Sequence, residues 1–243
     1  MSSRPKVMGM AVVLLTGTLG AGVAAAVPAK CFGKPATIVG SRGNDTITGT
    51  NGSDVIVGRD GADTVEGGGG FDLVCGGPGP DRLSGGRGGE FLFGGKGDDR
   101  LRGGAGPFSD YAPGPGRDRV VGSNVVDDVV HFIGATGPVV ASLITQEATG
   151  QGVDKLISVE HLLGGPFGDT LIGNSADNTL VGRAGADELR GGEGFDFLAG
   201  QKGDGHPRWS GLRHRRLLRG EQKRRPQHRR ADNGGPGRGD GRG

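Results

Sequence analysis

Carboxylates recur at a fixed interval of nine residues in the first half of the chain. Consecutive blocks of nine residues begin with glycine, repeat glycine at the fourth position and place an aliphatic residue at the eighth. The sixth position holds the acids Asp45, Asp54, Asp63, Asp72, Asp81, Glu90 and Asp99. Carboxylate oxygens are hard ligands, and Ca²⁺ binds six to eight such oxygens. The spacing therefore predicts a series of calcium ligands.

The other fixed positions of the block indicate how these acids are positioned. Glycine tolerates a positive φ and lets neighbouring turns approach closely. The aliphatic residue follows the acid by two positions, so it falls in a short strand whose successive side chains point to opposite faces. Two blocks then make one coil of turn, strand, turn and strand. In such a coil Asp45 lies over Asp63 and Asp63 over Asp81, while Asp54 lies over Asp72 and Asp72 over Glu90.

Stacked acids of this kind need a cation. An ion between two turns receives two carboxylates and backbone carbonyls, which neutralise its charge and supply its oxygens. Without the ion, each edge of the stack is a row of like charges beside a narrow core. We therefore expect folding and calcium binding to be coupled. A disordered glycine-rich linker is the alternative from composition alone, but a linker needs no fixed phase of nine residues.

The block G-G-x-G-x-D-x-U-x is the calcium-binding pattern of parallel β-rolls. The segments CFGKPATIVGSRGNDTITGT and GGGGFDLVCGGPGPDRLSGG resemble small secreted actinobacterial members of the RTX (repeats-in-toxin, hemolysin-type) family. The resemblance extends from Cys31 to Gly203. It implies an all-β fold, a parallel β-roll or calcium-binding β-solenoid, in which the sixth residue of each block is a ligand. Glu90 departs from the family's Asp.

Beyond the strict repeats of residues 40–102, the phase loosens over residues 103–163 and returns over residues 164–203. The loosened part predicts degenerate repeats and wider coils, with strands near Val129–Phe132, Val139–Ser142 and Lys155–Val159. Asp127 and Val129 keep the phase of a block that starts at Gly122, although Val125 replaces its turn glycine. The further candidate ligands are Asp118, Asp154, Asp169, Asn178, Asp187 and Asp196.

The N-terminal residues predict secretion. Residues 1–26 have a basic start, an apolar stretch and an Ala-Ala-Ala cleavage site, which is typical of a signal peptide. A membrane anchor is the alternative, but the apolar stretch is short and broken by glycine, and we expect no membrane span in the mature chain. Residues 27–39 form a leader. The predicted location is extracellular or at the cell surface, where Cys31 and Cys75 could form a disulfide or remain two small buried hydrophobes.

The C-terminal residues 204–243 differ from the rest in charge. They hold twelve Lys and Arg against four Asp and Glu, so the small overall net charge of +2 conceals an acidic repeat region and a basic tail. The tail is too polar to form a core, and we expect it to be disordered. Two origins stay open: a basic arm for an anionic polymer, or a shift of reading frame that interrupts the repeat at Asp204.

The sequence predicts binding without catalysis. It contains no G-x-S-x-G, H-E-x-x-H or phosphate-binding loop motif, and His131 and His161 stand alone in the repeat region. We expect a non-enzymatic calcium-binding protein, with calcium ions and a cell-surface or matrix polymer as candidate partners and no nucleic acid. The alternatives are the repeat portion of a larger secreted enzyme or toxin, and a cell-surface adhesin.

Overall fold

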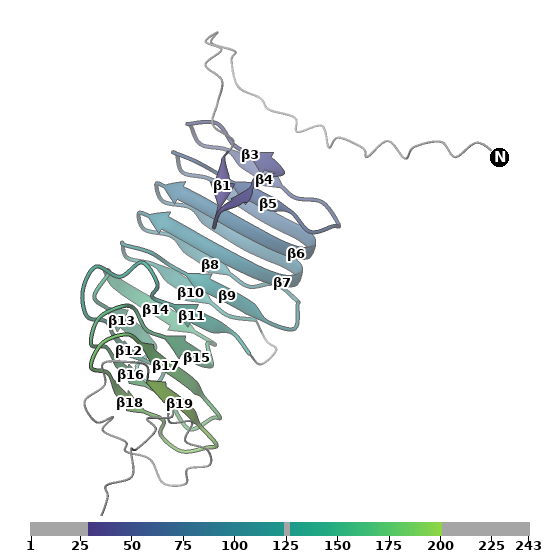
Figure 1. Ribbon diagram of the computed structural model, residues 1–243. Helices are drawn as coiled ribbons and strands as arrows, with labels where there is room; N and C mark the ends of the chain where they lie inside the picture. The colour runs from purple at the N-terminus through teal and green to yellow at the C-terminus, as the bar shows by residue number, and fades with distance from the viewer. Residues whose placement is uncertain (1–28, 124–126, 201–243) are drawn as a thin grey trace, which may run out of the picture.

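The computed structural model describes residues 29–123 and 127–200, and every regular element in these residues is a β-strand. The strands stack as the coils of a solenoid (Figure 1). No helix in this part of the chain is long and apolar enough to cross a membrane. The predicted signal peptide 1–26, the basic tail 204–243 and Val125 lie outside the described residues.

One coil consists of two nonapeptide blocks, as the sequence predicts. Strands pair in parallel with partners eighteen residues away, as in Ile47 with Val65 and Ile56 with Val74. Strands that follow alternate blocks therefore lie on two opposite faces of the roll. β6 and β7 each run through a turn and contribute to both faces.

The first face begins with one series of strands, and the second face is formed by the other. The first series is β4 (Thr46–Thr48), the start of β6 (Thr64–Pro78), the start of β7 (Arg82–Lys96), β8 (Arg100–Arg102) and β10 (Arg119–Val121). The second is β3 (Ile38–Val39), β5 (Val55–Val57), the ends of β6 and β7, β9 (Ser109–Ala112), β11 (Val129–His131), β15 (His161–Leu163), β17 (Thr179–Arg183) and β19 (Phe197–Gly200).

The core is a column of side chains between the two faces. It takes one aliphatic residue from each strand crossing, and these residues are almost completely shielded from solvent. The eighth-position residues Ile47, Ile56, Val65, Val74, Leu83, Leu92, Leu101, Val120, Leu171, Leu180, Leu189 and Leu198 all lie in this column. Burial of the alternate residues of short strands thus holds the coils together.

The first face contains a chain reversal that the sequence pattern did not predict. β12 (Val140–Ser142), β13 (Glu147–Thr149) and β14 (Val153–Ile157) form an antiparallel meander. β14 pairs with β10 on one side, while β12 pairs with β16 (Thr170–Ile172), which in turn pairs with β18 (Glu188–Arg190). The meander therefore inserts between two parallel stacks and joins them into one continuous sheet.

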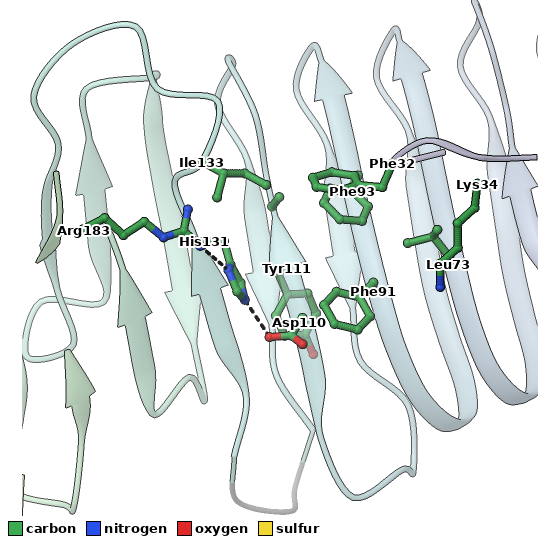
Figure 2. Close-up of a pocket in the computed structure, with 11 residues that line it drawn as sticks. Phe32, Lys34, Leu73, Phe91, Phe93, Asp110, Tyr111, His131, Ile133 and Arg183 are labelled. Atoms are coloured by element: carbon green, nitrogen blue, oxygen red, sulfur yellow. Dashed lines mark hydrogen bonds and ion pairs between the residues drawn. The ribbon is translucent and has the colours of Figure 1, made fainter. Parts of the chain in front are cut away.

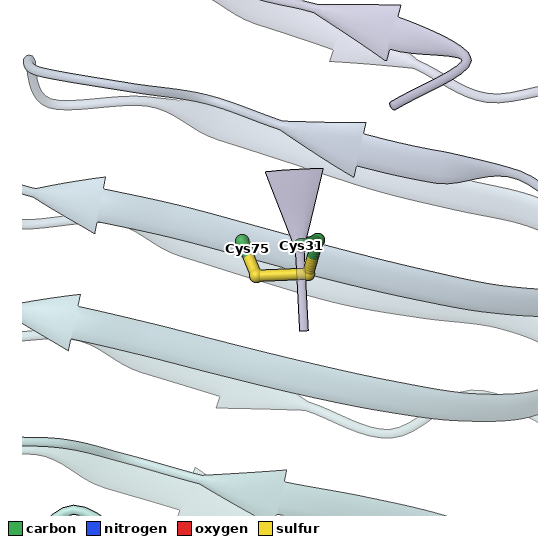
Figure 3. The surroundings of a disulfide bond; sticks show 2 residues. All are labelled: Cys31 and Cys75. Carbon is green, nitrogen blue, oxygen red and sulfur yellow. A yellow bond between two sulfur atoms is a disulfide. The ribbon is translucent and has the colours of Figure 1, made fainter. Parts of the chain in front are cut away.

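A small N-terminal hairpin lies across the outside of the roll. β1 (Lys30–Cys31) and β2 (Lys34–Pro35) pair with each other and run across the strands of the second face (Figures 1 and 3). Cys31 forms a disulfide with Cys75 at the end of β6, with the two Cα atoms 5.8 Å apart. Of the two alternatives for these cysteines, the structure shows the disulfide.

Candidate calcium-binding turns

The acids of the repeat form ladders along the edges of the roll. The backbone N–H of each acid donates to the carboxylate Oδ1 of the acid one coil further on. This bond is 2.8 Å from Asp45 to Asp63, from Asp63 to Asp81 and from Asp81 to Asp99. Asp54 donates in the same way to Asp72 at 2.9 Å on the other edge. The stacking order predicted from two blocks per coil is thus the order in the structure.

The ladders continue through the loosened part and into the second set of repeats. The backbone N–H of Asp99 donates to Asp118, and that of Asp118 donates to Asp154 at 3.0 Å, although the two acids are 36 residues apart. After the meander, the ladders resume with bonds from Asp169 to Asp187 and from Asn178 to Asp196. Most of these side chains are buried, whereas Asp45 and Asp196, near the two ends of the roll, are half-buried.

The second carboxylate oxygen divides the turns into two kinds. In one kind, the backbone N–H of the second residue of the block donates to this oxygen, and we call it a closed turn. Ser41 donates to Asp45 Oδ2 at 2.6 Å and Thr50 donates to Asp54 Oδ2 at 2.7 Å. The remaining closed turns are those of Asp128, Asp169 and Asn178, whose acceptor oxygens are bound by Ser123, Gly165 and Asn174.

In the other kind, the second residue is left-handed and its N–H does not reach the carboxylate; we call it an open turn. The second residues of these turns are Arg59, Gly68, Gly77, Gly86, Gly95, Gly114 and Gly150, with φ between 82° and 122°. One carboxylate oxygen in each turn is buried and has no hydrogen-bond partner among the described residues. These oxygens are Oδ2 of Asp63, Asp72, Asp81, Asp99, Asp118 and Asp154, and Oε1 of Glu90. The turns of Asp187 and Asp196 have the same backbone, with Arg183 at +70° and Gly192 at +102°.

Backbone oxygens meet these carboxylates at the first glycine of the block. A Cβ built on Gly58 would lie 2.6 Å from the carbonyl oxygen of Gly76, one coil on, and would also collide with Asp63 Oδ2. A Cβ on Gly67 would lie 2.7 Å from Asp72 Oδ2 and would collide with the Gly85 carbonyl. The turns therefore bring a carboxylate and a carbonyl from adjacent coils to one point, which only glycine leaves accessible.

This donor set fits Ca²⁺. Buried carboxylate oxygens without partners are energetically costly unless a cation compensates them. The described residues contain no group of three or more His, Cys, Asp or Glu side chains that could hold a metal. Each turn supplies one acid, so the other ligands must be backbone carbonyls, which Ca²⁺ accepts and Zn²⁺ does not favour.

Burial also shifts the acids toward the protonated form. It raises the pKa of Asp72, Asp81 and Asp118 to about 6, because desolvation penalises the charged carboxylate more than the backbone hydrogen bond stabilises it. The same cause raises the pKa of Glu90 and Asp154 to about 7 and that of Asp99 to about 8. The charge of a neighbouring carboxylate adds to the shift, so the ladders hold protons near neutral pH when no cation is bound.

The coil that starts at Gly103 replaces the acid by hydroxyl groups. Ser109 lies in the sixth-position ladder and donates to Glu90 Oε2 at 3.1 Å. Tyr111 takes the place of the core aliphatic residue, and its buried hydroxyl lies against Gly103, where an acid oxygen lies in other blocks. The longer side chain of Glu90 reaches this ladder, while Asp110 faces outward. This coil closes without a carboxylate of its own.

One further acid lies one residue away from its predicted place. Asp127, which the repeat phase selects, is largely exposed, and the neighbouring Asp128 is completely buried. Asp128 accepts hydrogen bonds from Ser123, and Val130 rather than Val129 enters the core. The expectation for Asp127 and Val129 was therefore wrong, because the unit contains one extra residue. Glu160, which accepts from the N–H of Asp128 at 3.2 Å, also belongs to this ladder and was not predicted.

The fold and these turns define a class of protein, a parallel β-roll with carboxylate-bearing glycine turns. Residues 39–74, 76–107 and 163–198 match the family model described as RTX calcium-binding nonapeptide repeat (4 copies). The chain is thus an RTX calcium-binding repeat protein, and the intervening residues 108–162 contain the meander and the irregular coils. No curated protein shows significant similarity to this chain.

Proposed function

We propose that the protein is a secreted, non-enzymatic calcium binder whose roll is completed by calcium outside the cell. The observation that carries this proposal is the row of buried carboxylate oxygens left without partners in the open turns. A cation between the coils would compensate these charges and join adjacent turns. Free calcium is plentiful outside cells, and the Cys31–Cys75 disulfide suits the same oxidising environment.

Open turns are the calcium sites of this proposal. Their carboxylates keep one oxygen for a cation, whereas in closed turns the same oxygen already accepts a backbone N–H. In the turns of Asp45 and Asp54 the hydroxyls of Ser41 and Thr50 donate to it as well. A closed turn therefore gains less from the ion, because calcium would replace hydrogen bonds rather than fill an unmet need. The sites cluster at Asp63, Asp72, Asp81, Glu90, Asp99, Asp118 and Asp154.

Binding and folding are coupled in this proposal. Each open turn adds a charge to a ladder in which like charges are one coil apart, and the narrow core offers limited compensation. Each ion orders a turn that also serves the neighbouring coil, so binding is cooperative along the roll. The affinity expected for extracellular modules of this kind corresponds to a Kd of about 10⁻⁴–10⁻³ M.

Calcium titration of a matched pair of variants tests the proposal. Asp81→Asn removes the acid of an open turn, and Asp54→Asn removes the acid of a closed turn. We expect calcium to increase the β-sheet circular dichroism of the unmodified protein. We expect Asp81→Asn to reduce the number of bound ions, measured by equilibrium dialysis, and Asp54→Asn to leave that number unchanged. A protein without a calcium-induced gain of structure would contradict the function, and equal losses in the two variants would contradict only the assignment to open turns.

A further inference from the structure

A groove of about 380 Å³ lies on the second face of the roll, beside the N-terminal hairpin. Its walls are Phe32, Leu73, Phe91, Phe93 and Ile133, together with parts of Tyr111 and Ala112, and it is far from the glycine turns (Figure 2). The volume lies within the range of small-molecule pockets, about 300–1,000 Å³. Its walls are mostly aromatic and aliphatic, which suits an apolar chain.

The hairpin builds one wall of this groove. Phe32 stacks on Phe93 with ring centroids 4.0 Å apart, and Phe93 lies nearly parallel to Phe91 at 6.5 Å. Phe32 has a φ of +49° and is 61% exposed, so the hairpin holds a large apolar side chain outside the core. The Cys31–Cys75 disulfide fixes this arrangement (Figure 3).

A cation stands at each end of the groove, Arg183 at one and Lys34 at the other (Figure 2). Arg183 Nη2 lies 3.2 Å from His131 Nδ1, and His131 Nε2 lies 2.7 Å from Asp110 Oδ1. Arginine has no acceptor, so its N–H donates to Nδ1 and the proton of the imidazole is on Nε2, facing Asp110. Asp110 thus orients His131, and His131 orients the guanidinium.

The guanidinium keeps donors for a ligand. It forms no ion pair with a carboxylate in the described part of the chain, and Asp110 reaches it only through the imidazole. Arg183 is half-buried, and burial lowers the pKa of its guanidinium, so an anion in the groove would relieve the cost of its charge. Arg183 also occupies a left-handed position, with φ +70°, where most open turns of this chain have glycine.

We propose that this groove binds a small organic carboxylate with an apolar chain. The carboxylate pairs with the free edge of the Arg183 guanidinium, which presents two donors in a fixed plane. The chain lies along Phe91 and Phe93 toward Phe32. An oligosaccharide fits less well, because the walls offer few polar groups to its hydroxyls, and a cation is disfavoured by the two positive ends.

Binding of octanoate at saturating calcium tests this site, with octanol and octylammonium as ligands of equal chain length and different charge. Ligand-observed NMR and chemical-shift changes of the groove residues would give the affinities. We expect octanoate to bind at least about tenfold more tightly than octanol and octylammonium not to bind. Equal binding of octanoate and octanol, or no binding of octanoate, would overturn the proposal.

Two glycine variants separate binding from folding. Arg183→Gly and Arg59→Gly both restore glycine at the second position of a block, where both arginines have a positive φ. Both variants should therefore remain folded, with a melting temperature equal to or above that of the parent. We expect only Arg183→Gly to weaken octanoate binding, by about tenfold or more. Equal octanoate affinity in the two variants would overturn the assignment. This result is independent of the calcium proposal, since calcium stoichiometry is measured in the same samples.

Discussion

The backbone N–H of Asp63 donates to Oδ1 of Asp81 at 2.8 Å, while Oδ2 of Asp81 is buried with no partner among the described residues. One oxygen of the carboxylate therefore joins two coils directly, and the other is available to a cation. The same side chain has a structural and a ligand role. This division explains how the turns can be preformed and still require an ion for their charge.

Metal-free stability should fall as pH rises. Burial raises the pKa of Asp81 to about 6 and that of Asp99 to about 8, above the ordinary value of 3.8 that applies to the unfolded chain. The folded state thus binds more protons, so this contribution to stability is fully present below about pH 4 and is lost as pH rises to about 8. Thermal melts in a chelator at pH 5 and pH 8 measure it, and a higher melting temperature at pH 8 would contradict it.

Calcium should reverse this dependence, because the ion requires the ionised carboxylates. We expect the stabilisation by calcium to be larger at pH 8 than at pH 5. We also expect protons to be released when calcium is added near neutral pH, where Asp99 and Asp154 are partly protonated in the metal-free roll. A pH indicator in weakly buffered solution detects this release, and its absence would show that the acids are already ionised.

Thr50→Gly should convert a closed turn into an open one. Thr50 donates both its backbone N–H, at 2.7 Å, and its hydroxyl, at 2.8 Å, to Asp54 Oδ2. Glycine removes the hydroxyl and permits the left-handed backbone of the open turns. We expect one more calcium ion per molecule by equilibrium dialysis, whereas Thr50→Ser, which keeps the hydroxyl, should bind the same number as the parent. An unchanged number in Thr50→Gly would mean that the hydrogen bonds do not control the site.

The repeat predicted the roll because its period and its burial pattern have the same cause. Ile47, Val65 and Leu83 are spaced by one coil and enter one core, so glycine, acid and aliphatic residues keep one phase. The disulfide was left open, since sequence does not give the distance between Cys31 and Cys75. The division into open and closed turns was missed, although Ser41, Thr50, Ser123 and Asn174 carry a signal for it: a polar second residue in place of glycine.

Other features depend on contacts that a local pattern does not contain. Gly165 has the residue of an open turn but forms a closed one, in a place where Phe132 and Ala135 pack against it. The single extra residue before Asp128 moves every later side chain of that unit to the opposite face. The meander arises because β13 pairs antiparallel with β14, and no nonapeptide signal marks that reversal.

Loss of the disulfide should release the hairpin and leave the calcium sites intact. The bond closes a loop between residues 44 positions apart, and loss of a native disulfide typically costs about 2–5 kcal/mol. We expect Cys31→Ser with Cys75→Ser to lower the melting temperature and to expose Phe93 to a hydrophobic dye. Calcium stoichiometry should not change, because the acids lie at the edges of the roll. A proportional loss of bound calcium would show that the hairpin supports the turns.

Leu101→Ala should weaken both the core and a calcium site. Leu101 is 1% exposed and lies in the core column between Leu83 and Val120, its partners in the adjacent strands. Removal of such a side chain costs about 2–5 kcal/mol, which denaturant titration in saturating calcium would measure. Leu101 follows Asp99 by two residues, so we also expect weaker calcium binding at that turn. Val153→Ala is the control, because Val153 is 50% exposed on β14 and its loss should change stability by no more than about 0.5 kcal/mol. Equal effects of the two substitutions would mean that the column does not stabilise the roll, and that the turns and their ions hold the coils together.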